Sequence, residues 1–136
     1  LIMNISYRDT HTFRAEDLEA LFLSVNWSSG HFPEKLVIAM QNFETVYTAW
    51  DGEKLVGLIS AMDDGIMTAY IHYLLVHPDY QGSGIGKALV EQMKTKYADY
   101  LRIVLIAYNK ECGFYESCGF RRETESSPMF ITELWT

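Results

Sequence analysis

The chain has 136 residues, a formal net charge of −7 and an apolar fraction of 49%. This length and composition suit one folded domain, and we predict a single domain over residues 1–136. The acidic balance argues against nucleic-acid binding, and no apolar run approaches the roughly 20 residues that cross a membrane.

The first part of the chain predicts one strand and two helices. Residues 5–8 are strand-like, and apolar residues recur at helical spacing over residues 12–25. Residues 26–32 then form a loop with two aromatic side chains, and Pro33 suits the first turn of a short second helix. The composition of this loop is too general to indicate a ligand.

Three strand-like segments follow, at residues 44–50, 55–62 and 66–76, and Asp-Gly turns separate them. An Asp-Gly turn between strand-like segments is typical of a hairpin, so the three segments predict an antiparallel meander. Two carboxylates, Asp63 and Asp64, stand in the second turn. Forming that turn explains them better than catalysis does.

A glycine-rich loop and a helix come after the third of these strands. The loop reads Gln81-Gly82-Ser83-Gly84-Ile85-Gly86-Lys87, and apolar residues then recur every four positions up to residue 101. The first N–H groups of a helix lack backbone partners, and glycine lets an anion approach them closely. The loop therefore predicts an anion site, above all for a pyrophosphate.

Two common phosphate-binding templates do not fit this loop. A dinucleotide fingerprint starting at Gly82 requires a glycine where the chain has Lys87. A Walker A loop requires glycine at position 81 and Ser or Thr at position 88, where the chain has Gln81 and Ala88. A nucleotide-binding protein is therefore a distant alternative.

The last part of the chain predicts another strand, a short helix and a hairpin. Residues 102–107 form a strand parallel to residues 66–76, because a crossover helix joins the two. Residues 110–118 are a helix closed by Gly119. Residues 120–125 and 129–134 read as a final hairpin. The whole is an α+β fold, with four helices and a mixed, mostly antiparallel sheet of six to seven strands.

Motifs between residues 70 and 120 resemble those of a known enzyme family. Gln81, Gly84 and Gly86 match the pattern Q/R-x-x-G-x-G/A, and residues 76–80 look like its usual lead-in. Further on, Asn109 and the run Phe-Tyr-Glu-Ser-Cys-Gly-Phe at 114–120 look like a second motif. Together they resemble motifs A and B of the GNAT superfamily of acyl-CoA-dependent N-acetyltransferases.

The resemblance implies a GNAT-like fold with acetyl-CoA as cosubstrate. In that fold the two parallel strands splay apart past a bulge, and the cofactor arm fills the gap. Backbone groups of the earlier strand hold the pantetheine arm, and the N–H groups of residues 82–87 hold the pyrophosphate. The implied cofactor-binding residues are Leu74, Leu75, Val76, Gln81, Gly82, Ser83, Gly84, Ile85, Gly86, Lys87, Asn109 and Tyr115. The side chains of the three strand residues are expected to be core, so their predicted role concerns the backbone. Alternatively, the loop is an ordinary turn at a helix start, Lys87 is a solvated charge and Asn109 is a helix cap.

Tyr115 is the first candidate catalytic residue. When an amine attacks a thioester, CoA leaves as a thiolate, and a tyrosine can protonate or stabilise that thiolate through a hydrogen bond. Enzymes of the GNAT family often use the tyrosine of this helix in that way. The alternative is an aromatic core residue, since the chain has nine tyrosines.

The second candidate catalytic residue is the base that accepts the amine proton. The family often uses a glutamate on the earlier strand, but residues 70–76 contain no carboxylate. His72, which we expect to share a strand face with Tyr70 and Leu74, could take the proton through water. The alternatives are a structural His72 and capture of neutral amine without a base, with His31 as a weaker candidate.

The sequence thus predicts transfer of an acetyl group from acetyl-CoA to a primary amine, by direct attack in a ternary complex. A small-molecule acceptor is favoured over a protein lysine or N-terminus, and a non-catalytic CoA-binding module is the rival from another class. Neither Cys112 nor Cys118 has a paired base or a metal-ligand spacing, so no catalytic cysteine or metal is expected. We expect reduced thiols in a cytoplasmic protein, and a homodimer is left open.

Overall fold

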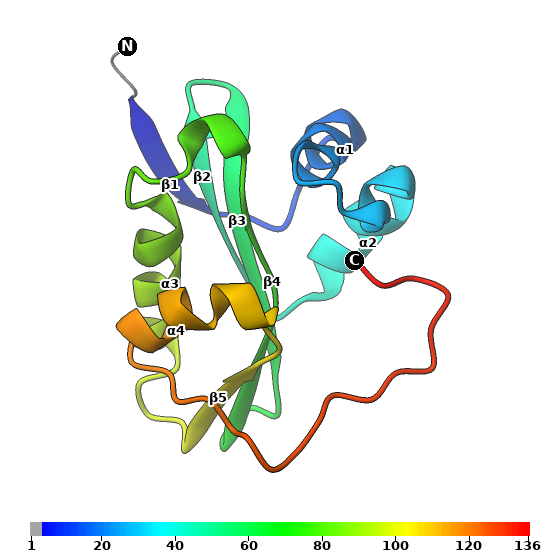
Figure 1. Cartoon of the computed structure of the whole chain (residues 1–136). Helices are drawn as coiled ribbons and strands as arrows, with labels where there is room; N and C mark the ends of the chain where they lie inside the picture. Colours follow the sequence, from blue (N-terminus) through cyan, green and yellow to red (C-terminus); the bar gives the residue numbers. More distant parts are fainter. Residues whose placement is uncertain (1–3) are drawn as a thin grey trace.

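A mixed sheet of five strands forms the centre of the molecule (Figure 1). The structure is a computed structural model, and it describes residues 4–136. The strands, in their order across the sheet, are β1 (Ile5–Asp9), β2 (Thr45–Asp51), β3 (Lys54–Asp63), β4 (Thr68–Val76) and β5 (Arg102–Leu105). Neighbours from β1 to β4 are antiparallel, and β4 and β5 are parallel. The predicted meander and parallel pair are confirmed.

Helices cover both faces of this sheet (Figure 1). On one face, α1 (Ala15–Ser24) and α2 (Pro33–Asn42) pack on a core that includes Phe22 and Met40. On the other face, α3 (Ile85–Lys96) packs through Leu89 and Met93. The remaining elements are α4 (Cys112–Ser117) and the short 3₁₀ turns η1 (Ser28–His31), η2 (Pro78–Tyr80) and η3 (Asn109–Glu111). The four predicted helices are present.

The predicted final hairpin is wrong. Residues 120–125 and 129–134 form no strands, so the sheet has five strands rather than six to seven. The segment instead runs away from β5 and returns beside the α1 and α2 layer (Figure 1). There the N–H and the hydroxyl of Ser29 both donate hydrogen bonds to the carbonyl of Thr136. A strand pattern indicates only that a segment can pair, and these contacts hold its end away from β5.

The helix after the glycine loop ends at residue 96 rather than at the predicted residue 101. The Tyr97 hydroxyl donates to Asp63 Oδ2 at 2.8 Å and lies 2.8 Å from Thr45 Oγ1. The Tyr100 hydroxyl donates to the other oxygen of Asp63 at 3.2 Å. Both tyrosines therefore bind the turn between β3 and β4. The two tyrosines continue the apolar spacing of the helix because both contact this turn, and not because the helix extends to them.

We expect Tyr97→Phe to lower the free energy of unfolding by about 1–3 kcal/mol, because it leaves buried polar partners unsatisfied. Tyr97 is 1% exposed, and its hydroxyl joins β2 to the β3–β4 turn. Urea denaturation followed by circular dichroism measures the change. Tyr7→Phe, at a tyrosine that is 40% exposed, is the control. A loss no larger than that of the control would contradict the prediction.

Candidate functional site

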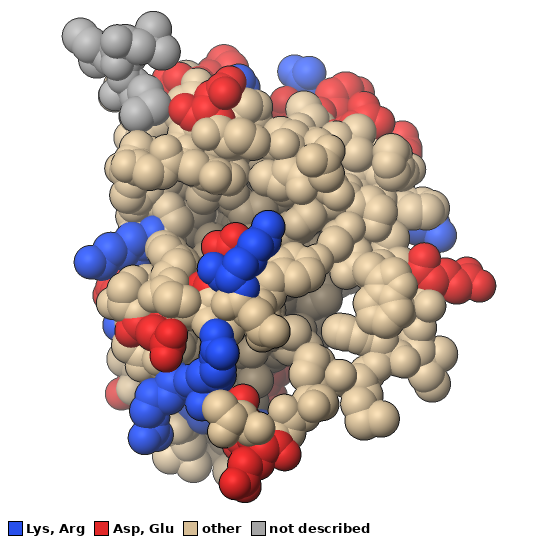
Figure 2. Space-filling model, in the orientation of Figure 1, with Lys and Arg blue, Asp and Glu red and all other residues tan. Residues whose placement is uncertain are grey.

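A groove of about 650 Å³ opens between β4, the chain after β5, the start of α3 and α4. It contains the predicted strand, loop and tyrosine together, and residues 24–27 of the loop after α1 line its other side. Figure 2 shows that basic side chains of this face gather on the side of α3 and α4. Lys87 and Lys110 are the basic residues of the groove lining. The groove therefore suits an anionic ligand at its α3 end.

A bulge in β4 creates the gap that this groove occupies. Tyr73 lies opposite Ser60 of β3, and Ile71 lies opposite Ala61, so His72 is an extra residue in β4. Pairing between β4 and β5 stops at the same point, since Ile71 and Leu105 are the last pair. The bulge and the separation of the two parallel strands agree with the expectation from the GNAT resemblance.

Beyond the bulge, one edge of β4 is free of strand pairing. The N–H of His77 donates to the Val56 carbonyl, so residues at alternate positions direct their backbone groups toward β3. By this alternation the backbone of Leu75 also faces β3, whereas the backbone groups of Leu74 and Val76 face the groove. Leu75 lines the groove as well, but by this alternation Leu74 and Val76 are the predicted strand residues whose backbone groups face it.

The glycine loop leaves the start of α3 open. Gly82 and Gly84 have φ angles of +79° and +87°, which side chains rarely adopt, and a Cβ at either position would meet no atom within 4 Å. Gly84 is the N-cap of α3 and supplies no capping side chain, and the first turn carries no acidic residue. The first N–H groups of α3 thus have no capping side chain, in a turn that lines the groove, which agrees with the anion hypothesis. Ile85, Gly86 and Lys87 complete this turn and line the groove.

Side-chain hydrogen bonds hold the loop in place. Gln81 Nε2 donates to the Val76 carbonyl at 2.9 Å, which joins the loop to the free edge of β4. The Ser83 hydroxyl donates to the Tyr80 carbonyl, and Ser83 is not among the residues that line the groove. The prediction for Ser83 concerns its backbone N–H, whereas its hydroxyl is used within the loop.

Asn109 is the other predicted residue that does not line the groove. It is the first residue of η3, and its carbonyl accepts a hydrogen bond from Arg122 Nη2 at 3.4 Å. The cap of η3 is Tyr108, so the alternative of a helix cap does not describe Asn109 either. Tyr108 does line the groove, one position earlier in the chain.

Tyr115 lies in α4 and lines the groove. Its ring packs edge-on against Phe114 and Phe120, with ring centroids 5.1 and 5.9 Å away. Burial, with smaller effects from Glu111 and the two cysteines, raises the pKa of Tyr115 to about 12. The hydroxyl therefore keeps its proton at neutral pH and can donate a hydrogen bond to a ligand. Phe114 also lies close to Gly86, which joins α4 to the start of α3.

His72 projects from the bulge among three aromatic rings. The ring centroids of Tyr73, Tyr70 and Phe43 lie 4.3, 5.7 and 5.7 Å from that of His72. The residue is exposed, yet partial desolvation lowers the pKa of its imidazole below the ordinary value. Leu74 packs in the core on the α3 side, so the prediction that it shares a face with His72 is wrong. The bulge shifts the alternation by one residue.

The weaker candidates His31, Asp63 and Asp64 do not line the groove. Asp64 accepts hydrogen bonds from three successive N–H groups of residues 66–68, and these lower the pKa of its carboxyl. Sequence reasoning missed Lys110 and Glu111, which do line the groove. The available sign in the sequence was their position between Asn109 and the run at 114–120, the two parts of the second motif.

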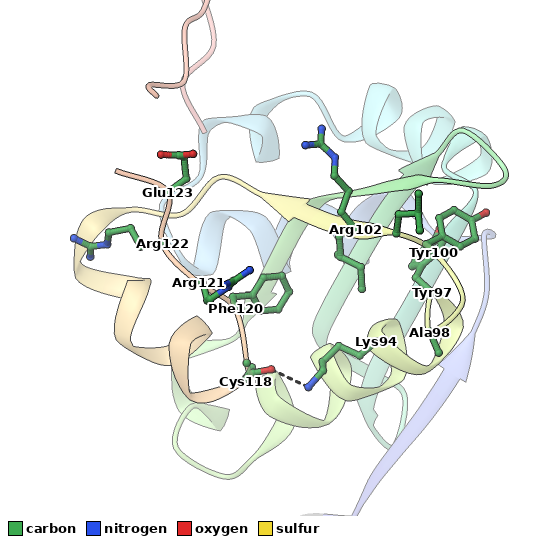
Figure 3. Close-up of a pocket in the computed structure, with 13 residues that line it drawn as sticks. Lys94, Tyr97, Ala98, Tyr100, Arg102, Cys118, Phe120, Arg121, Arg122 and Glu123 are labelled. Atoms are coloured by element: carbon green, nitrogen blue, oxygen red, sulfur yellow. Dashed lines mark hydrogen bonds between the residues drawn. The ribbon is translucent and has the colours of Figure 1, made fainter. Parts of the chain in front are cut away.

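A second cavity, of about 740 Å³, lies between the end of α3, β5 and residues 118–123 (Figure 3). Lys94, Arg102 and Arg121 are among its lining residues, and Lys94 Nζ donates to the Cys118 carbonyl at 2.8 Å. None of the predicted cofactor-binding or catalytic residues lines this cavity. The candidate active site is therefore the groove beside β4.

Three further features bear on function. Within residues 4–136, no three His, Cys, Asp or Glu side chains are placed to hold a metal ion together. In the same part of the chain, no helix has the length and apolar character that crossing a membrane requires. Cys112 and Cys118 are both unbridged.

Comparison with known proteins identifies the family. Residues 42–122, more than half of the chain, match the family model described as "Acetyltransferase (GNAT) domain". The chain belongs to the GNAT family of acetyltransferases. A curated relative from Gracilaria tenuistipitata var. liui, named an uncharacterized N-acetyltransferase ycf52, is 33% identical over 125 residues. That alignment covers 88% of this chain and 68% of the relative.

Two other similar proteins support the assignment to GNAT. A protein of Glycine max, named histone acetyltransferase TAP1, is 31% identical over 122 residues, which cover 80% of this chain and 52% of that protein. The chain thus spans only about half the length of that relative. A solved GNAT family acetyltransferase from Streptococcus pneumoniae TIGR4 is 27% identical with a TM-score of 0.81, covering 96% of this chain and 99% of that one.

Proposed function

We propose that this GNAT acetyltransferase transfers an acetyl group from acetyl-CoA to a primary amine of a small molecule. One observation carries the proposal: the uncapped start of α3, the free edge of β4 and Tyr115 line one groove. These features suit a pyrophosphate, an extended amide arm and a thioester, which are the parts of acetyl-CoA in order.

The protein groups have separate tasks in binding. The open N–H groups of residues 82–87 and the positive end of the α3 dipole hold the pyrophosphate. Leu74 offers its backbone groups, and Val76 its N–H, to the amides of the pantetheine arm, much as a neighbouring strand would; the Val76 carbonyl is already bound to Gln81. A backbone N–H of this edge also donates to the thioester carbonyl and stabilises the negative charge that develops there.

The residues beside the thioester serve the reaction. The amine nitrogen attacks the acetyl carbon, and a C–N bond forms while the C–S bond breaks. His72, neutral because its pKa is lowered, takes the amine proton through water. Tyr115 donates its hydrogen bond to the departing thiolate. Binding of both substrates in one groove makes a covalent enzyme intermediate unnecessary.

The pH profile of His72→Gln tests the base. A histidine base works only when neutral, so activity is lost as the pH falls through the histidine pKa. Because that pKa is lowered, we expect the inflection of kcat/KM to lie below about 6.5, the ordinary histidine value. His72→Gln should remove this inflection and most of the activity near neutral pH.

The opposite result has a distinct signature. If no side chain takes the proton, kcat/KM rises with pH toward the amine pKa of about 10 in the parent and in the variant alike. A His72→Gln protein with the parent's activity and pH profile would show that His72 is structural. Phe43→Leu, which removes one ring beside His72, is a control expected to raise the inflection toward its ordinary pH.

One comparison favours a second candidate function. The Glycine max relative is named a histone acetyltransferase, which suggests a protein lysine as an alternative acceptor. A panel of small amines, histone-derived peptides and peptide N-termini, each incubated with acetyl-CoA, distinguishes the acceptors by release of free thiol. Turnover of small amines alone supports the proposal. Acetyl-CoA binding without turnover of any acceptor would favour a CoA-binding module. We also propose a cytoplasmic site of action, which cell fractionation tests.

A further inference from the structure

Tyr80 lies at the root of the glycine loop and is tied to a distant part of the sheet. It is the last residue of η2 and only 9% exposed. Its hydroxyl donates a 2.6 Å hydrogen bond to Asp51 Oδ2, at the end of β2. The Lys54 ammonium, at the start of β3, lies 5.4 Å from the centre of the Tyr80 ring. Residues on both sides of the β2–β3 turn thus hold the Tyr80 side chain, one by a hydrogen bond and the other by a cation–π contact.

The main chain of Tyr80 holds the loop at the same time. Its carbonyl accepts the hydroxyl hydrogen bond of Ser83, and its N–H donates to the His77 carbonyl at 2.8 Å. Tyr80 is therefore the point at which the sheet, the turn before the loop and the loop itself are joined. The carboxylate of Asp51 raises the pKa of the Tyr80 hydroxyl, so the hydroxyl keeps the proton that it donates.

The glycines of the loop explain why such an anchor matters. Gly82 and Gly84 can adopt many backbone conformations, and only one arrangement directs the N–H groups of α3 at a single anion. A loop that is disordered before binding must be ordered on binding, which weakens affinity. An anchor at the root of the loop removes that cost by ordering the loop before the ligand binds. Tyr80 also lines the groove, but its hydroxyl is bound to Asp51.

We propose that the hydrogen bond between Tyr80 and Asp51 is a positioning device that keeps the glycine loop in its anion-binding shape and thereby sets the affinity for acetyl-CoA. This inference rests on the proposed function, because it concerns the same groove. Tyr80 and Asp51 act here through the loop and take no part in the chemical step. Loss of the bond should therefore raise the Kd and KM of acetyl-CoA and leave kcat nearly unchanged.

Titration calorimetry with acetyl-CoA tests the proposal in a set of variants. Tyr80→Phe keeps the ring and removes the bond, and we expect the Kd to rise by roughly tenfold, the scale of one hydrogen bond to a charged group. Asp51→Ala should weaken binding equally, and the double variant should be no weaker than either single one. Asp51→Asn keeps an oxygen acceptor and should retain most of the affinity.

Tyr97→Phe is the matched control. It also removes a bond from a buried tyrosine to an aspartate, but at the other end of α3, beside the second cavity (Figure 3). Tyr97 does not line the groove. The variant should lower stability and leave the Kd for acetyl-CoA as in the parent. Hydrogen exchange of residues 82–87 without ligand gives a second readout: Tyr80→Phe should speed it, and Tyr97→Phe should not.

The outcomes separate this inference from the proposed function. A parent protein that does not bind acetyl-CoA overturns the proposed function, while exchange in the unliganded loop still reports on the anchor. Tyr80→Phe with parental Kd and parental loop exchange overturns the anchor alone. A double variant whose loss of binding free energy is the sum of the two single losses would also overturn the anchor, because the two side chains would then act independently.

Discussion

Gly84→Asp is expected to abolish measurable binding of acetyl-CoA. Position 84 is the N-cap of α3, and its φ of +87° places any side chain in a strained backbone conformation. A carboxylate there would also accept the hydrogen bonds of the N–H groups that the pyrophosphate needs, and its charge would repel the phosphates. Strain, competition and repulsion all act in one direction, so we expect the Kd to rise by more than about 100-fold.

Thermal unfolding with and without acetyl-CoA measures this effect. The parent should gain melting temperature with ligand by mass action, and Gly84→Asp should gain none. Gly84→Ala is the control, because it introduces the same backbone strain without a charge, and there is space for its Cβ. It should lose some stability and still respond to acetyl-CoA. Equal ligand responses of Gly84→Asp and the parent would show that the anion binds elsewhere.

Tyr115→Phe is expected to lower kcat by about 10²–10³-fold, the usual size of a lost hydrogen-bond donor to charge that develops in the transition state. The ring contacts with Phe114 and Phe120 remain, so stability and acetyl-CoA affinity should change little. The pKa of about 12 exceeds the value near 8.5 of a free thiol, so the hydroxyl acts by stabilising the thiolate. It should not titrate in the working range, and the parent should therefore show no loss of kcat up to about pH 10.

Single-turnover measurements separate this chemical effect from product release. Tyr47→Phe is the control, since Tyr47 is partly buried in β2 and does not line the groove. It should keep the parental kcat. A Tyr115→Phe protein with unchanged kcat would reduce Tyr115 to a packing residue, and a variant with weaker acetyl-CoA binding alone would assign it to the cofactor.

Much of the fold follows from local patterns in the sequence. The turns at Asp51 and Asp63 predict the antiparallel strands, because Asp-Gly pairs tolerate the backbone angles of tight hairpins. The loop before α3 is also visible in the sequence, because glycine adopts without strain the positive φ angles found at Gly82 and Gly84. Such features depend on neighbours in the chain and are visible without the tertiary structure.

The errors all concern contacts between distant segments. α3 ends early because Tyr97 binds Asp63 across the sheet. The final hairpin is absent because Thr136 binds the turn at Ser29, although both segments have strand-like sequences. The groove also has lining residues that no motif marks, such as Glu111. In each case the deciding partner is more than thirty residues away or belongs to another element, so spacing in the sequence carries no sign of it.

The sequence by itself determined the family motifs, the glycine loop before α3 and the place of Tyr115 in the second motif, because these depend on residue type at short spacing. Only the tertiary structure decided which groups face the groove. Pairing of β4 with β5 ends beside the extra residue His72. Beyond this point the backbone groups of Leu74 face the groove and those of Leu75 face β3. A bulge is an extra residue in one strand relative to its partner. It depends on how the two strands pair and not on the sequence of either strand alone.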